Sequence, residues 1–111
     1  MTLVTILRHE GYEVLDVYRG DDVVPLARKF RPDVIILDIG MPGQSGYAIA
    51  QEVRADSPDG AKPMLIAISG QWTKPTDQAV SRLVGFDHYL VKPADPKAVL
   101  RLLDELKEPS G

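Results

Sequence analysis

The sequence contains no cysteine and only two histidines, His9 and His88, which lie far apart in the chain. It therefore has no disulfide framework, no thiol nucleophile and no zinc site built from cysteine or clustered histidine. Hydrophobic runs are also short: the longest, residues 64–68, is far below the about 20 residues that cross a membrane. Met1 is not followed by a basic segment and a hydrophobic leader, so no secretory signal is visible. We expect a cytoplasmic protein without a membrane segment.

Positive charge is scarce as well. The chain has 13 lysines and arginines against 16 aspartates and glutamates, a formal net charge of −3. This balance disfavours sequence-independent binding to nucleic acid, which depends on a basic surface. The sequence also lacks a Gly-x-Gly-x-x-Gly segment, a Walker loop and a Ser–His–Asp arrangement. The common sites for dinucleotides, nucleoside triphosphates and acyl transfer are thereby disfavoured.

Length and composition indicate one globular domain. The chain has 111 residues, of which 44% are hydrophobic and 26% are charged, as in ordinary globular proteins. Area scaling gives a folded surface of roughly 6,100 Å² against roughly 17,700 Å² for the unfolded chain, so about two-thirds is buried on folding. We expect a single domain over residues 1–111, in which residues 107–111 are a short tail.

Four segments have the composition of strands and alternate with helical patterns. Residues 12–18 alternate hydrophobic and polar side chains, whereas the other three are short, nearly continuous hydrophobic runs, typical of strands covered on both faces. The predicted strands are residues 12–18, 34–39, 63–69 and 88–91, and the predicted helices are residues 21–31, 45–55, 75–84 and 95–106. Residues 2–7 fit either a helix that ends before Gly11 or a strand. The alternation predicts an α/β fold with a parallel sheet.

Three polar side chains follow three of the predicted strands. Asp38, Ser69 and Lys92 each stand at or just after a strand end, and the carboxyl ends of parallel strands form the edge where ligands bind. An aspartate can act as a nucleophile toward a phosphoryl group, and a hydroxyl and an ammonium can stabilise the phosphoryl oxygens. Taken singly, each fits a turn, a cap or a surface position. Their coincidence favours a site for phosphoryl transfer.

Three segments resemble the receiver domain of two-component response regulators. They are RPDVIILDIGMPGQSGY at residues 31–47, LIAISGQ at residues 65–71 and GFDHYLVKPADP at residues 85–96. The likeness extends over residues 1–106 in the right order and spacing. It implies a flavodoxin-like, three-layer α/β/α fold around a parallel sheet. It also implies a signalling module rather than an enzyme, with autophosphatase activity at most.

The resemblance assigns roles to individual residues. It makes Asp38 the phospho-acceptor, which takes a phosphoryl group from a histidine kinase or a phosphotransfer protein. Ser69 matches the hydroxyl residue that moves onto the phosphate, and Lys92 matches the lysine that pairs with it, joined to Pro93 by a cis bond. Tyr89 matches the aromatic residue that turns inward when Ser69 moves.

The resemblance also implies a Mg²⁺ ion, for which this sequence has few ligands. Asp38 and the backbone carbonyl of Gly40 match two of them, but the first strand of the family, with its acidic residues, has no counterpart here. We expect Asp21 and Asp22, the one acidic pair, at the opposite end of the sheet. Three explanations of the missing strand are open. The start site is misplaced, the sheet rearranges so that residues 2–7 fill the gap, or the chain borrows a strand from a neighbour in a homodimer or strand exchange. We expect weak Mg²⁺ binding.

Two other functions compete with phosphoryl signalling. A phosphatase of the haloacid dehalogenase type also has an aspartate nucleophile, a hydroxyl residue and a lysine, but it needs a second aspartate where this chain has Gly40. A degenerate receiver would act only as an interaction surface. Two residues are weaker candidates. His88 is either a proton shuttle or a surface histidine. Trp72 either shields the site or contacts a partner, or it covers the backbone of a loop.

Overall fold

The structure, a computed structural model, describes residues 2–40, 42–57, 63–70 and 75–107. Its elements in chain order are α1 (Leu3–His9), the 3₁₀ helix η1 (Gly20–Asp22), α2 (Val23–Phe30), β1 (Val34–Asp38), α3 (Gly46–Asp56), β2 (Met64–Ser69), α4 (Pro75–Val84), β3 (His88–Val91) and α5 (Pro96–Lys107). None of the described helices is long and apolar enough to cross a membrane.

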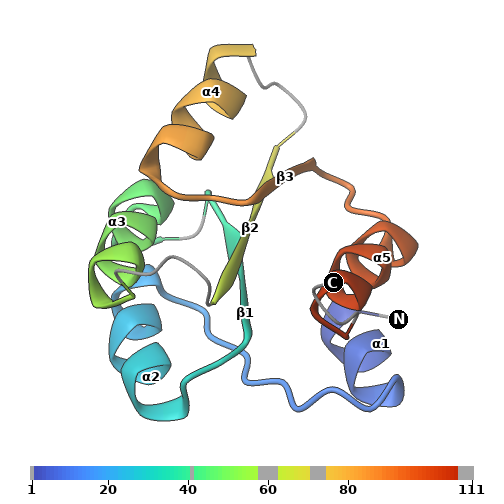
Figure 1. Ribbon diagram of the computed structural model, residues 1–111. Coiled ribbons are helices and arrows are strands. Elements are labelled where there is room, and N and C mark those ends of the chain that lie inside the picture. The colour runs from blue at the N-terminus through green and yellow to red at the C-terminus, as the bar shows by residue number, and fades with distance from the viewer. Residues whose placement is uncertain (1, 41, 58–62, 71–74, 108–111) are drawn as a thin grey trace.

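The three strands form one parallel sheet in the order β1-β2-β3. Figure 1 shows α2 and α3 on one side of this sheet and α1 and α5 on the other. The neighbours α2 and α3, α3 and α4, and α1 and α5 contact each other. The predicted α/β/α architecture with a parallel sheet is therefore confirmed.

Two hydrophobic clusters make up the core, one on each face of the sheet. Side chains of successive strand residues point to opposite faces, so Ile35 and Leu37 join one cluster while Val34 and Ile36 contact the other. The first cluster includes Ile49, Val53 and Phe86 from the α3 side, and the second includes Leu7, Val99 and Leu103 from α1 and α5. This double burial explains why the strands are continuous hydrophobic runs.

Local signals explain where the helices begin. The Thr2 hydroxyl accepts a hydrogen bond from the Thr5 N–H at 3.2 Å, and the Ser45 hydroxyl accepts one from the Tyr47 N–H at 3.1 Å. Both residues are side-chain N-caps, which satisfy amides that have no partner within the helix. The question left open for residues 2–7 is thus decided in favour of a helix.

The prediction of a strand at residues 12–18 is wrong. No ladder of hydrogen bonds joins this segment to another strand among the described residues. It leads from α1 to η1, with Tyr12 and Val14 against one core cluster and Val17 against the other. The alternation of side chains matches partial burial of the segment, but a strand also requires a neighbouring strand, and none lies beside this segment in the described sheet.

Candidate functional site

The register of the sheet brings three strand ends together. Asp38 at the end of β1 lies opposite Ile68, and Ser69 at the end of β2 lies opposite Val91. Lys92 follows β3 directly, and its N–H donates a hydrogen bond to the Ser69 carbonyl at 2.7 Å. Asp38, Ser69 and Lys92 therefore lie at one edge of the sheet, as the strand pattern predicted.

The carboxylate of Asp38 is held by two groups. Its Oδ1 accepts a hydrogen bond from the Gly40 N–H at 2.9 Å. Its Oδ2 contacts the Nζ ammonium of Lys92 in an ion pair. The side chains of Asp38 and Lys92 are 41% and 47% exposed, so a phosphoryl donor in solution can reach the carboxylate.

Ser69 and Tyr89 lie near this pair without being fully exposed. Ser69 is half-buried at the end of β2. Tyr89 is half-buried on β3, opposite Ala67, and packs against the core cluster that contains Leu37. The Lys92-Pro93 peptide bond is cis, which matches the conformation that the resemblance implies.

The prediction for Asp21 and Asp22 is wrong. The Oδ1 of Asp21 accepts a hydrogen bond at 3.0 Å from the N–H of Gln44, in the loop that follows the carboxyl end of β1. Asp21 therefore lies beside this end of the sheet rather than the opposite one. The physical reason is connectivity. Residues 12–18 lead directly into η1, so Asp21 lies at the end of the sheet where this extended segment finishes, as a helix does after a parallel strand.

The residues present do not fit a tight Mg²⁺ site. Within the part of the chain that the structure describes, no three His, Asp or Glu side chains lie close enough to hold a metal ion. Both oxygens of the Asp38 carboxylate already have partners, and the nearby Asp21 is bonded to Gln44 and Arg19. A Mg²⁺ ion normally takes one or two carboxylates together with water and phosphate oxygens.

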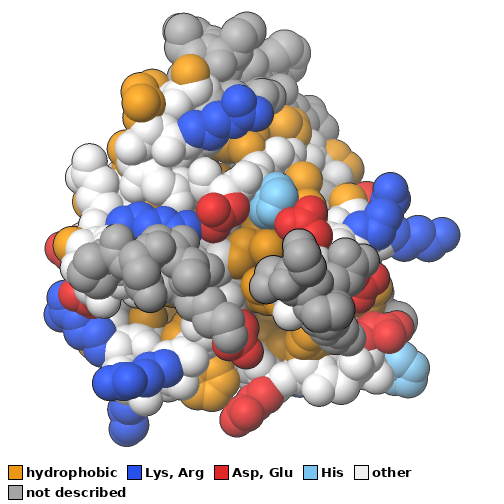
Figure 2. Space-filling model, viewed as in Figure 1, with side chains coloured by type: hydrophobic (Ala, Val, Ile, Leu, Met, Phe, Trp, Pro, Cys, Tyr) orange, Lys and Arg blue, Asp and Glu red, His pale blue; other side chains and the backbone are white. Residues whose placement is uncertain are grey.

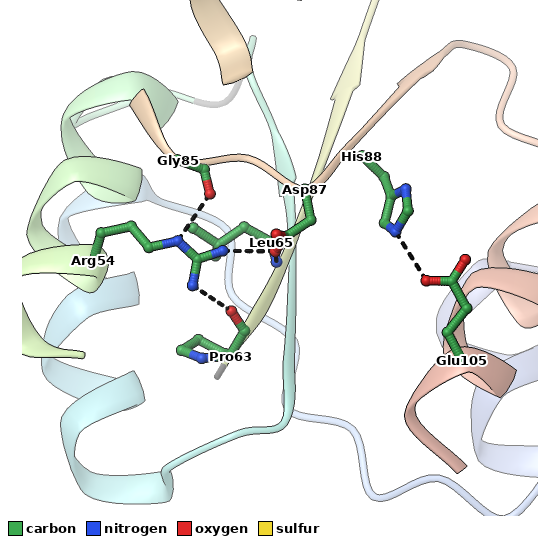
Figure 3. Close-up of polar contacts among 7 residues, drawn as sticks. All are labelled: Arg54, Pro63, Leu65, Gly85, Asp87, His88 and Glu105. Carbon is green, nitrogen blue, oxygen red and sulfur yellow. Dashed lines mark hydrogen bonds and ion pairs between the residues drawn. The ribbon is translucent and has the colours of Figure 1, made fainter. Parts of the chain in front are cut away.

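A half-buried arginine at the other end of the sheet was not predicted. Arg54 on α3 donates from Nε to the Gly85 carbonyl at 2.9 Å and from Nη1 to the Pro63 carbonyl at 2.8 Å. Figure 3 shows the guanidinium pointing toward these carbonyls and toward Asp87 at the start of β3. No pattern in the sequence distinguishes Arg54 from the exposed arginines, because its partners lie far away in the chain.

The weaker candidates take no part in the strand-end site. His88 Nε2 lies 3.4 Å from an Oε2 of Glu105 on α5, as Figure 3 also shows. This pair connects β3 to α5 at the start of β3, whereas Lys92 follows its end. Trp72 lies outside the described residues. On the face seen in Figure 2, acidic and basic side chains are interspersed.

Comparisons with known proteins agree with this geometry. The family model described as response regulator receiver domain matches residues 1–104. The chain is 32% identical to Protein PilH of Pseudomonas aeruginosa over 92% of this chain and 83% of PilH. It is 37% identical to the transcriptional regulatory protein CreB of Escherichia coli over 88% of this chain, but it spans only 41% of CreB.

Solved structures give the same result. A putative response regulator from Chloroflexus aurantiacus superposes with a TM-score of 0.81 at 27% identity, over 96% of this chain and 86% of that one. The chemotaxis protein CheY4 of Vibrio cholerae gives a TM-score of 0.81 at 30% identity, over 93% and 84%. The chain therefore belongs to the response regulator receiver family, the phospho-accepting signalling modules of two-component systems.

Proposed function

We propose that Asp38 is the residue that accepts the phosphoryl group, supplied by a sensor histidine kinase or a phosphotransfer protein. The observation that supports this most is the contact between Asp38 and Lys92 beside Ser69 at the carboxyl end of the sheet. A carboxylate that is exposed and already faces a cation can attack phosphorus while the added negative charge is compensated.

The transfer step uses these side chains alone. A carboxylate oxygen of Asp38 forms a bond to phosphorus as the bond from phosphorus to the donor nitrogen breaks, and the electron pair of that bond stays on the donor imidazole. The product is an acyl phosphate on Asp38. The Lys92 ammonium and the Ser69 hydroxyl then donate hydrogen bonds to the phosphoryl oxygens. Water can later hydrolyse the acyl phosphate. This autophosphatase reaction is the one enzymatic activity that we propose for the chain.

Signalling follows from the new partner of Lys92. When phosphate oxygens replace the Asp38 carboxylate as its main contact, Ser69 moves toward them and Tyr89 turns inward. Because Tyr89 lies on β3 between α4 and α5, its movement changes the surface of these elements, where a partner binds. Receiver domains in general bind Mg²⁺; in this chain the ligands would be Asp38 and the Gly40 carbonyl, and binding would be weak. We place the module in the cytoplasm.

Mass spectrometry of the intact protein tests the proposal. The purified chain is incubated with acetyl phosphate in a Mg²⁺-containing buffer, beside Asp38→Asn and the control Asp104→Asn, which removes an exposed carboxylate from α5. Wild type and Asp104→Asn should each gain one phosphoryl group, and Asp38→Asn should gain none. A phosphoryl adduct on Asp38→Asn would refute the assignment. A wild-type chain without an adduct would favour a receiver that acts only as an interaction module.

A further inference from the structure

The loop that follows β1 is fastened at its middle to η1. The N–H of Gly20 donates to the carbonyl of Pro42 at 2.8 Å. The Oδ1 of Asp21 accepts from the N–H of Gln44 at 3.0 Å. These two bonds bracket Gly43 and join two parts of the chain more than 20 residues apart.

The two backbones are in direct contact at this point. A Cβ atom added to Gly20 would lie 2.2 Å from the backbone carbonyl oxygen of Gln44. Because this atom belongs to the backbone, a change of side-chain rotamer cannot remove the clash. Gly43 has φ +95°, in the region that favours glycine, and an added Cβ would lie 3.2 Å from the Asp21 Oδ2. The fit of η1 against the loop thus depends on these two glycines.

Asp21 is also held by a residue of its own segment. Its Oδ2 lies 3.1 Å from Nη2 of Arg19, in an exposed ion pair. The neighbouring Asp22 is exposed, and no hydrogen bond or ion pair of its carboxylate is found within the described part of the chain. The two adjacent carboxylates therefore differ in their contacts: Asp21 binds the loop and Arg19, and no such bond of Asp22 is found among the described residues.

The same loop determines how the Asp38 carboxylate is oriented. One of its amides, the Gly40 N–H, is the donor to Asp38 Oδ1 at 2.9 Å. Its last residue, Ser45, caps α3. Between these ends the loop has two bonds to η1, from the Gly20 N–H to the Pro42 carbonyl and from the Gln44 N–H to Asp21, and only the second is made by a side chain that a substitution can remove.

We propose that Asp21 is a positioning residue for phosphoryl transfer to Asp38, a role that rests on the proposed function. Asp21 fixes the Gln44 amide and so the loop, and the loop presents the Gly40 N–H that orients the attacking carboxylate. A misplaced nucleophile reacts slowly even when all reacting groups are present. Asp21 touches neither phosphate nor Asp38, so it acts only through the loop.

Three variants test this role: Asp21→Ala removes the acceptor, Asp21→Asn keeps an oxygen acceptor without charge, and Asp22→Ala is the matched control. Two quantities are measured, the hydrogen-exchange rates of the Gly40 and Gln44 amides by NMR and the rate of phosphoryl uptake from acetyl phosphate. Asp21→Ala should speed exchange at Gln44 by about tenfold, the worth of one charge-assisted hydrogen bond. It should also speed exchange at Gly40 and slow uptake several-fold.

Asp21→Asn should recover most of the uptake rate, and Asp22→Ala should match wild type in both measurements. Urea unfolding at the assay temperature shows that each variant is folded. The role is overturned if Asp21→Ala takes up phosphoryl groups at the wild-type rate, or if Asp22→Ala slows uptake as much, which would make the effect one of charge alone. If the wild-type chain itself takes up no phosphoryl group, the proposed function fails and this role fails with it.

Discussion

The guanidinium of Arg54 on α3 meets the carboxylate of Asp87 at the start of β3, with Nη2 and Oδ2 2.6 Å apart. The same Asp87 oxygen accepts the N–H of Leu65 on β2 at 2.8 Å. Together with the bonds from Arg54 to Pro63 and Gly85, this contact joins α3, β2 and β3 at the end of the sheet opposite Asp38. It stabilises the scaffold and leaves the strand-end site untouched.

Arg54→Ala should therefore lower the free energy of unfolding by about 2–3 kcal/mol, because three acceptors lose a donor whose side chain is only 19% exposed. The control is Arg28→Ala, which breaks an exposed pair with Asp56 and should leave the urea midpoint nearly unchanged. Urea unfolding followed by circular dichroism measures both. Equal losses in the two variants would show that burial of Arg54 contributes nothing.

The pair of Arg28 and Asp56 predicts a small dependence of stability on pH. The hydrogen bond from Arg28 lowers the pKa of Asp56 below its ordinary value of 3.8. A lowered folded-state pKa means that the stabilisation is present above pH 3.8 and is lost as the pH falls through the folded-state value. An NMR titration of the Asp56 carboxyl carbon should show this pKa return to the ordinary value in Arg28→Ala. An unchanged pKa in that variant would contradict the ion pair.

Lys92→Ala should uncouple phosphorylation from the conformational change more than it alters stability. The side chains of Lys92 and Asp38 are 47% and 41% exposed, so their ion pair is partly solvated and the urea midpoint should shift little. The change in the Tyr89 ring resonances on adding acetyl phosphate should disappear, because no cation moves onto the phosphate. Lys97→Ala, an exposed lysine on α5, is the control and should keep that change. A normal Tyr89 response in Lys92→Ala, or a large drop in its urea midpoint, would refute the prediction.

Most of the architecture could be predicted from the sequence because it depends on local patterns. The bounds of α4 and β3 agree with the prediction, and each end of the other predicted elements that form lies within one or two residues of its predicted position. Hydrophobic runs and caps such as Ser45 determine these elements. The position of Asp38, Ser69 and Lys92 at one edge could be predicted because the carboxyl ends of parallel strands meet there.

The errors and omissions come from contacts between distant segments. Residues 12–18 have the side-chain pattern of a strand, but pairing depends on a neighbour that the pattern does not report. The bond between Asp21 and Gln44 joins residues 23 positions apart. The bonds from Arg54 to Gly85 and Asp87 join residues 31 and 33 positions apart. Connectivity alone would have placed Asp21 correctly, whereas no local signal identifies Arg54.

The chain should self-associate through β1. Asp33 and Ile39, at the two ends of β1, form backbone hydrogen bonds to β2. Since backbone groups of successive residues point to opposite edges of a strand, those of Val34 and Ile36 point away from β2, toward an edge where the described sheet has no further strand.

Light scattering at several concentrations measures this association. The mass should rise above 12.2 kDa with concentration, and Val34→Pro, which removes an edge-facing N–H at the first residue of β1, should shift it back toward the monomer. A constant mass of one chain across the range would show that the edge is closed within the chain.

Mapping the phosphoryl group to a residue tests the central claim most directly. An acyl phosphate, unlike a phosphate ester on serine, is reduced by borohydride, which converts the aspartate to homoserine. The wild-type chain is treated with acetyl phosphate, reduced with borohydride, digested and sequenced by mass spectrometry. We predict homoserine at position 38 and nowhere else, and only after acetyl phosphate treatment. Homoserine at another aspartate, or a phosphoryl group on Ser69 or His88 with Asp38 unmodified, would contradict the account.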